Sequence, residues 1–293
     1  MMVYTLTLKQ QAFILSSFFG GFSIRRLTVE FRTLFYIPIS SSTIYRLISN
    51  TIPRVDHVLS YLLTLGKVYT VRAGDVWEAD GTYTKGVKIC LILVRDLKTG
   101  FILGSVQSRT EDEVSIENAL REAKEVAHKC PKIFRCDGNP AYVKAAKKVF
   151  RNKTKVEVYK RVGRMGQNQA IEGYFSAFKD RLKSMHGMHS EARSRILLRG
   201  LVIDHNFVRS IDDFKHRTPA EMVGINIGSL FGDKWLTLLE LTKHYEKELQ
   251  KQDYPYKIKK ETGHQTSLGP FLDRKALSTG LNPRNDRCGR AML

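Results

Sequence analysis

The fold is decided by one stretch of the sequence, Val76-Trp77-Glu78-Ala79-Asp80-Gly81-Thr82-Tyr83. It has the pattern of a β-strand that ends on a carboxylate, Asp80, and turns at a glycine. A second apolar run closes on Asp137, and Glu172 lies in a helical stretch over 168–175. Two strand-end aspartates and one helical glutamate can converge on a pair of divalent metal ions. Such ions lie about 3.5–4 Å apart and bind the attacking and leaving oxygens of a phosphodiester.

Glu78 is an alternative to Asp80 as the first acid, because alternation along a strand places both side chains on one face. Asp80 is preferred because it is expected at the end of the strand. Taken alone, each acid is equally consistent with a turn or a surface position, and Asp-Gly pairs are common in turns. The three acids together, in this order and on these elements, favour chemistry.

Composition indicates a basic protein with room for more than one domain. A chain of 293 residues allows two domains, or one domain with appendages. The formal charge of +19 and the pI of about 9.8 make a polyanion the first partner to consider. Basic proteins also bind acidic membranes or ribosomal RNA, so charge alone does not choose among these partners.

Cysteine spacing and hydropathy point to a cytoplasmic protein without a membrane span. The four cysteines show no C-x-x-C spacing, which favours reduced thiols over a disulfide framework or a zinc site; they are Cys90, Cys130, Cys136 and Cys288. The apolar run over 12–22 is too short to cross a bilayer.

The first fifty residues have the pattern of a helix-turn-helix. Helices are expected over 8–19, 23–35 and 42–51, with Pro38 ending the second and Pro53 ending the third. The third helix would enter the major groove of DNA. Its outer face would carry side chains that can bond phosphates or base edges, namely Thr43, Tyr45, Arg46, Ser49 and Asn50. A plain helical subdomain that packs on the rest is the alternative.

The central part of the chain predicts three consecutive strands followed by alternating helices and strands, in the order βββαβαβα. The expected strands cover 75–80, 87–94, 101–106, 133–137 and 156–159, and the expected helices cover 113–127, 140–150 and the stretch with Glu172. Asp96 lies near the sheet as well, but its Asp-x-x-Thr-Gly setting is typical of a hairpin turn, so a structural role is expected.

Basic residues gather beside two of the acids. Residues 142–183 contain 12 Lys or Arg against three Asp or Glu, which favours a track for phosphates over a merely solvated face. On the helix with Glu172, helical periodicity places Ser176, Lys179 and Lys183 on the same stripe as the glutamate.

These features together resemble the DDE transposases of the retroviral-integrase-like superfamily, and among them the short insertion-sequence transposases of the IS-six type with a helix-turn-helix arm. The resemblance covers roughly residues 10–225. Its most specific parts are the interval from Asp137 to Glu172 and Lys179, seven residues after Glu172. Arg217-Thr218-Pro219-Ala220 also resembles a segment that often follows the catalytic domain in this family.

The resemblance implies an α/β, ribonuclease-H-like mixed sheet with flanking helices, preceded by an all-α helix-turn-helix domain. Two ions, Mg²⁺ or Mn²⁺, would be held by Asp80, Asp137 and Glu172, and Lys179 and Lys183 would contact DNA. The implied partners are double-stranded DNA and further copies of the chain, as a homodimer or a higher oligomer. A nucleoid-associated protein in the cytoplasm is expected.

The expected organisation has four parts: a helix-turn-helix domain over 1–53, a linker over 54–72, a catalytic domain over 73–225, and a helical extension with a poorly ordered tail over 226–293. The leading hypothesis is a transposase that binds the terminal inverted repeats of an insertion sequence, cuts DNA strands and transfers the 3′-OH ends to target DNA without a covalent enzyme intermediate. A transposase-derived DNA-binding regulator and a metal-dependent nuclease without strand transfer are the alternatives.

Overall fold

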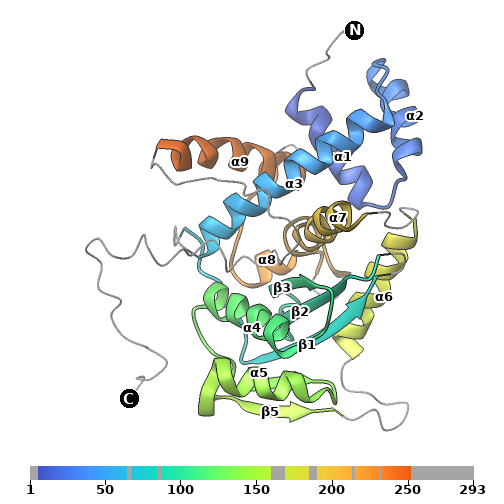
Figure 1. Cartoon of the computed structure of the whole chain (residues 1–293). Coiled ribbons are helices and arrows are strands. Elements are labelled where there is room, and N and C mark those ends of the chain that lie inside the picture. The colour runs from blue at the N-terminus through green and yellow to red at the C-terminus, as the bar shows by residue number, and fades with distance from the viewer. Residues whose placement is uncertain are drawn as a thin grey trace.

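The computed structural model describes residues 6–64, 68–84, 87–159, 169–184, 190–212, 215–230 and 232–251. Figure 1 shows helices α1–α3, α7 and α9 gathered at one end of the molecule, and the sheet with α4, α5 and α6 at the other. The helices are α1 (Leu8–Phe19), α2 (Ile24–Phe35), α3 (Ser41–Leu63), α4 (Glu113–Ala127), α5 (Pro140–Phe150), α6 (Gln169–Ser184), α7 (Glu191–Ile203), α8 (Pro219–Met222) and α9 (Lys234–Lys251). The strands are β1 (Val76–Tyr83), β2 (Cys90–Asp96), β3 (Ile102–Ser108), β4 (Ile133–Cys136) and β5 (Lys155–Val158).

The five strands form one mixed sheet in the order β3-β2-β1-β4-β5. β1, β2 and β3 form an antiparallel meander, whereas β4 pairs parallel with β1 and β5 pairs parallel with β4. Since β1 and β3 both run antiparallel to β2, the carboxyl ends of β1, β3 and β4 lie at the same edge. This arrangement confirms the expected order βββαβαβα and the ribonuclease-H-like fold.

Alternation along β1 gives the sheet two different faces. Trp77 packs edge-on against Phe150 of α5, with ring centroids 5.8 Å apart, so this face is apolar. α4 lies close to the same part of the sheet, because a Cβ at Gly104 of β3 would collide with the backbone of α4. The other face carries Glu78, which pairs across the ladder with Arg95, and α6 packs against β1.

The strand with the first acid is longer than the sequence suggested. β1 continues to Tyr83, which pairs with Cys90 of β2, so Asp80 and Gly81 lie inside the strand and not at its end. Pairing of β1 with β4, in contrast, stops at Glu78. Asp80 therefore lies just beyond the point where β1 loses its β4 neighbour, although hydrogen bonding to β2 continues. β2 begins at Cys90, three residues later than expected.

The amino-terminal helices form the expected helical region close to the predicted ranges, with one correction. Ser40 accepts a hydrogen bond from the Thr43 N–H and caps α3, but this helix does not end near Pro53. It continues to Leu63 because its apolar face stays buried after the proline. Packing compensates for the hydrogen bond that Pro53 cannot donate. The helix thus runs without a break across the expected boundary between arm and linker.

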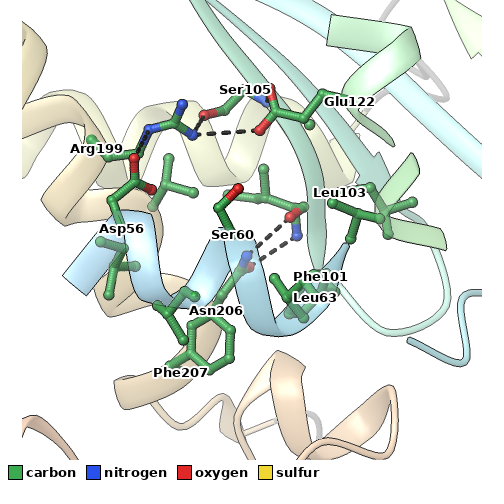
Figure 2. Close-up of a pocket in the computed structure, with 16 residues that line it drawn as sticks. Asp56, Ser60, Leu63, Phe101, Leu103, Ser105, Glu122, Arg199, Asn206 and Phe207 are labelled. Carbon is green, nitrogen blue, oxygen red and sulfur yellow. Dashed lines mark hydrogen bonds and ion pairs between the residues drawn. The ribbon is translucent and has the colours of Figure 1, made fainter. Parts of the chain in front are cut away.

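A buried arginine joins the arm helix α3 to the sheet and its helices. Arg199 of α7 places its Nε 3.3 Å from Asp56 Oδ2 of α3. Its Nη1 donates to Ser105 Oγ of β3 at 2.7 Å and lies 3.5 Å from Glu122 Oε1 of α4. Figure 2 shows Arg199 pointing into the space between these groups. Four elements that are distant in sequence therefore share one cation.

A small cavity of about 40 Å³ lies next to this arginine, between α3, β3, α4 and α7 (Figure 2). Nearby, the Asn206 amide closes two 2.9 Å hydrogen bonds with the backbone N–H and C=O of Ile102. None of the three predicted acids lines the cavity. It belongs to the joint between arm and sheet.

The carboxy-terminal helix returns to the arm. α9 packs against α1 and α3, and its Trp235 stacks on Phe19 with ring centroids 5.3 Å apart. The Trp235 Nε1–H donates to Asp204 Oδ1 at 3.2 Å. Buried apolar side chains form one cluster that runs from α1 through the sheet to α9. No helix in the described part of the chain is long and apolar enough to cross a membrane.

The buried carboxyl of Glu122 predicts a dependence of stability on pH. Burial raises its pKa to about 7, against the partial compensation of Arg199 and the Ser105 N–H. The folded state thus retains a proton that the unfolded chain loses near pH 4 to 5. The free energy of unfolding should fall as pH rises from there to about 7, by up to about 3 kcal/mol from this group.

Urea denaturation at several pH values tests this expectation. Glu122→Gln should flatten the fall between pH 4.5 and 7, while Glu240→Gln, on the exposed face of α9, should leave it as in the parent chain. The same slope for the parent chain and Glu122→Gln would show that this carboxyl does not set the dependence.

Candidate active site

The first two acids meet because of the register between β1 and β4. Val76 pairs with Ile133 and Glu78 with Arg135, an offset of 57 residues. The same offset separates Asp80 from Asp137, so the register continued past the last pair sets the two aspartates opposite one another. Adjacent strands lie about 4.8 Å apart. Asp80 of β1 and Asp137, directly after β4, therefore lie on neighbouring segments at the carboxyl edge of the sheet.

Backbone N–H groups orient both carboxylates locally. The Gly81 N–H donates to Asp80 Oδ1 at 2.8 Å, and the Asn139 N–H donates to Asp137 Oδ1 at 3.0 Å. α5 begins directly after Asp137 with Asn139 as its cap, so the positive end of the helix dipole is near that carboxylate. These donors hold one oxygen of each carboxylate in a fixed orientation.

The third predicted acid lies on α6, the helix that packs against β1. The side chain of Glu172 lies outside the described part of the structure, as does that of Lys183, so their expected roles stay predictions. Lys179 is exposed on α6. Two residues after Glu172, Tyr174 lies near Arg95 of β2, which places this end of α6 over the face that carries Glu78 and Asp80.

Glu78, the alternative first acid, is fully buried inside the sheet. Neither of its carboxylate oxygens has a hydrogen-bond partner, and burial raises the pKa of the group. Arg95 and Arg135 on the neighbouring strands partly offset that rise. A fully buried carboxyl cannot reach a DNA phosphate, so the structure favours Asp80 over Glu78 as the acid available to substrate.

A further acid lies beside the predicted ones and was missed from the sequence. Glu111 follows β3, at the same edge of the sheet, and its Oε1 accepts a 2.6 Å hydrogen bond from the Tyr142 hydroxyl of α5. Burial and the nearby Asp137 raise its pKa. The Thr-Glu-Asp sequence at 110–112 has the pattern of a helix start, and Asp112 does cap α4. This local pattern gave no indication that Glu111 lies beside the predicted acids.

The predicted DNA-contacting face of α3 is only partly available. Thr43, Arg46 and Asn50 are exposed along one stripe. Tyr45 instead packs under the Arg193 guanidinium of α7, which lies 4.6 Å from the ring centroid. The Ser49 hydroxyl is buried without a partner, which contradicts its expected place on the outer face.

The donor set suits a hard divalent cation, because Mg²⁺ and Mn²⁺ prefer carboxylate oxygens. Asp80 and Asp137 supply two such groups from neighbouring segments of the sheet edge. Among the side chains that the structure describes, no three His, Cys, Asp or Glu residues are grouped closely enough to hold a metal ion. Two aspartates thus fit the expected metal site, and a third ligand would have to come from elsewhere.

The expected thiol chemistry agrees with the described residues. Cys90 and Cys136 are buried, Cys130 is half-buried, and all three are free thiols. Cys288 lies outside the described residues. Burial raises the pKa of both Cys90 and Cys136 to about 12, so neither is a reactive thiolate at neutral pH.

Comparison with known proteins identifies the central region. Residues 74–210 match a family model described as a DDE domain, of the DDE transposases. This range contains Asp80, Asp137, Glu172 and the whole sheet. No curated protein matches the chain.

The solved structures similar to this chain include retroviral integrases. The HTLV-2 integrase catalytic core domain, in complex with magnesium, is 14% identical over 53% of this chain and 99% of its own, with a TM-score of 0.40. The BIV integrase core is 14% identical over 52% and 94%, with a TM-score of 0.38. A simian T-cell lymphotropic virus intasome, in complex with a PP2A regulatory subunit, is 12% identical over 74% and 75%, with a TM-score of 0.40.

The strand order and the paired aspartates agree with the match to the DDE domain. Over residues 74–210, the chain is similar to the DDE domain of transposases.

Proposed function

We propose that the protein is an insertion-sequence transposase, which binds the terminal inverted repeats of its own element, cuts DNA strands and joins the 3′-OH ends to target DNA. The observation that supports this proposal is the register of β1 and β4 within the region matched to the DDE domain, which would bring Asp80 opposite Asp137 if it continued two residues past Glu78. A regulator that only bound DNA would not need two aspartates at the edge of its sheet.

The acids would serve as the metal site. Asp80, Asp137 and Glu172 would hold two Mg²⁺ or Mn²⁺ ions, which when bound supply activation of water and stabilisation of charge on the phosphate. The chain's own contribution is orientation: Gly81 and Asn139 each fix one oxygen of an aspartate through a backbone N–H. Hydrolysis of one strand then exposes a 3′-OH. That hydroxyl attacks a target phosphodiester and displaces the 3′ oxygen of the target strand.

Recognition of the element ends would come from α3. Its stripe of Thr43, Arg46 and Asn50 is exposed and lies at the start of the helix, where a recognition helix contacts base edges. Thr43 also takes part in the cap, with its hydroxyl 2.9 Å from that of Ser40. Arg46 is thus the strongest candidate for a bidentate contact to guanine.

Cations near the acids would hold the DNA backbone. Lys179 is exposed on α6, the helix of Glu172, and Lys144 and Lys147 are exposed on α5, the helix that starts after Asp137. The net charge of +19 supports the same partner, double-stranded DNA. A homodimer or higher oligomer is proposed because two element ends must be brought together before they are joined.

Amide variants test the three acids. Asp80→Asn, Asp137→Asn and Glu172→Gln keep the shape of each side chain and remove its charge. Each should bind labelled end DNA like the parent chain and lose both cutting and joining in Mg²⁺. Because even outer-shell partners of metal ligands cost about 10- to 100-fold on mutation, the loss should exceed about 100-fold.

Glu113→Gln is the matched control, since it changes a glutamate two residues from Glu111 at the start of α4. The assay separates the alternatives: cutting with joining supports a transposase, cutting alone a nuclease, and binding without cutting a regulator. Activity of Asp137→Asn equal to that of Glu113→Gln would exclude the proposed metal site.

The Arg46→Ala variant tests the recognition helix. It should weaken binding to the element ends by about 1–3 kcal/mol and reduce discrimination against unrelated DNA, because alanine cannot form the two hydrogen bonds to a base edge. Arg121→Ala, at an exposed position of α4, removes the same charge away from the arm and should cost far less. Fluorescence anisotropy with end DNA and scrambled DNA measures both quantities. Equal losses of affinity in the two variants would mean that Arg46 contributes only non-specific electrostatic attraction to DNA.

A double variant of Lys179 and Lys183 tests whether these lysines contact the phosphates of the DNA backbone. Replacement of both by Ala should reduce the slope of log affinity against log salt by about 0.9 for each phosphate of duplex DNA that is no longer neutralised. Lys243 and Lys247 of α9 have the same spacing and are exposed, so their double alanine variant is the control. An unchanged slope in the α6 variant would leave these lysines on an ordinary solvated face.

A further inference from the structure

Glu111 is held in place by the two segments that carry the aspartates. The Tyr142 hydroxyl, which donates to Glu111 Oε1 at 2.6 Å, belongs to the first turn of α5, directly after Asp137. The Glu111 N–H donates to the Tyr83 hydroxyl at 3.2 Å, and Tyr83 ends the strand of Asp80. The loop after β3 thus bonds to both segments.

The glutamate also occupies space that β1 leaves open for it. A Cβ at Gly81 would collide with the Glu111 carboxylate, so the glycine lets this acid lie against the backbone next to Asp80, and any other residue would displace it. By alternation, the Gly81 position faces α5, the side that Trp77 also faces. Glu111 thus approaches the edge of the sheet from the α5 side. The contact with Glu111 accounts for a glycine at position 81 inside a strand, where no turn is present.

The charges at this edge influence one another. Burial, and after it Asp137, raises the pKa of Glu111; burial, and after it Glu111 and Asp80, raises the pKa of the Tyr142 hydroxyl. Tyr142 therefore stays protonated and acts as the donor. Two carboxylates, Glu111 and Asp80, thus lie within electrostatic reach of the Tyr142 phenol, and Asp137 lies within electrostatic reach of Glu111.

We propose that Glu111 is a positioning residue of the Asp80–Asp137 site, a fourth acid that raises its affinity for divalent cations and, through Tyr142, fixes the segment of Asp137. This inference rests on the proposed function, because it needs a cation at the two aspartates. Glu111 would make two contributions to cation binding, and variants can separate them. The charge belongs to Glu111 alone, whereas the fixed position depends on the hydrogen bond from Tyr142.

Binding of Mn²⁺ to the purified full-length chain without DNA tests the proposal, with free Mn²⁺ measured by electron paramagnetic resonance. Glu111→Gln removes the charge but keeps an oxygen that can accept from Tyr142, so a purely structural role would survive. The variant should bind Mn²⁺ about tenfold more weakly. Tyr142→Phe keeps the charge and loses the hydrogen bond, and should give a smaller loss. Glu113→Gln should bind like the parent chain.

Comparison with the aspartates separates the two claims. Weaker binding in Asp80→Asn and Asp137→Asn with parent affinity in Glu111→Gln would overturn the role of Glu111 and leave the metal site standing. Parent affinity in both aspartate variants, or no binding by the parent chain, would overturn the metal site and the inference with it. Far-ultraviolet circular dichroism and thermal unfolding confirm that each variant is folded. If Glu111→Gln unfolds, Glu111→Asp replaces it: it keeps the charge on a shorter side chain that loses the Tyr142 bond, so parent affinity would contradict the proposal.

Discussion

The parallel pairing of β1 with β4 is the constraint on which the site depends. A parallel neighbour needs a long crossover, and here β2, β3 and α4 supply it. A shift of one residue in this register would turn the side chains of one strand to the opposite face. Buried Trp77 and Phe134 oppose each other in the ladder and penalise such a slip. Core packing thus fixes the position of Asp80 relative to Asp137.

The joint between arm and sheet depends on a different interaction. Arg199 is surrounded by Asp56, Glu122 and Ser105, so removal of any one partner leaves buried charge less well compensated. Because α3 is continuous from Ser41 to Leu63, this contact fixes the same helix whose first turns carry Arg46. DNA held by α3 would therefore take a defined orientation relative to the sheet.

Sequence patterns predicted most of the fold, because periodicity and capping signals act locally. α4 and α5 have the expected bounds, and the meander and the parallel strands are present. The predicted end of β1 was wrong, since Asp-Gly was interpreted as a turn, whereas Gly81 lies inside the strand against the Glu111 carboxylate. The end of α3 was wrong because tertiary packing outweighs the preference of Pro53 to end a helix. Glu111 was missed because its partner Tyr142 is 31 residues away.

The central claim is our proposal that two aspartates placed by strand register form a metal site, and anomalous diffraction from crystals grown with Mn²⁺ tests it most directly. We expect a Mn²⁺ peak within coordination distance of both Asp80 and Asp137, about 2.1–2.4 Å from a carboxylate oxygen of each. A peak elsewhere with these two carboxylates turned apart, or ordered crystals without any peak at this edge of the sheet, would contradict the account.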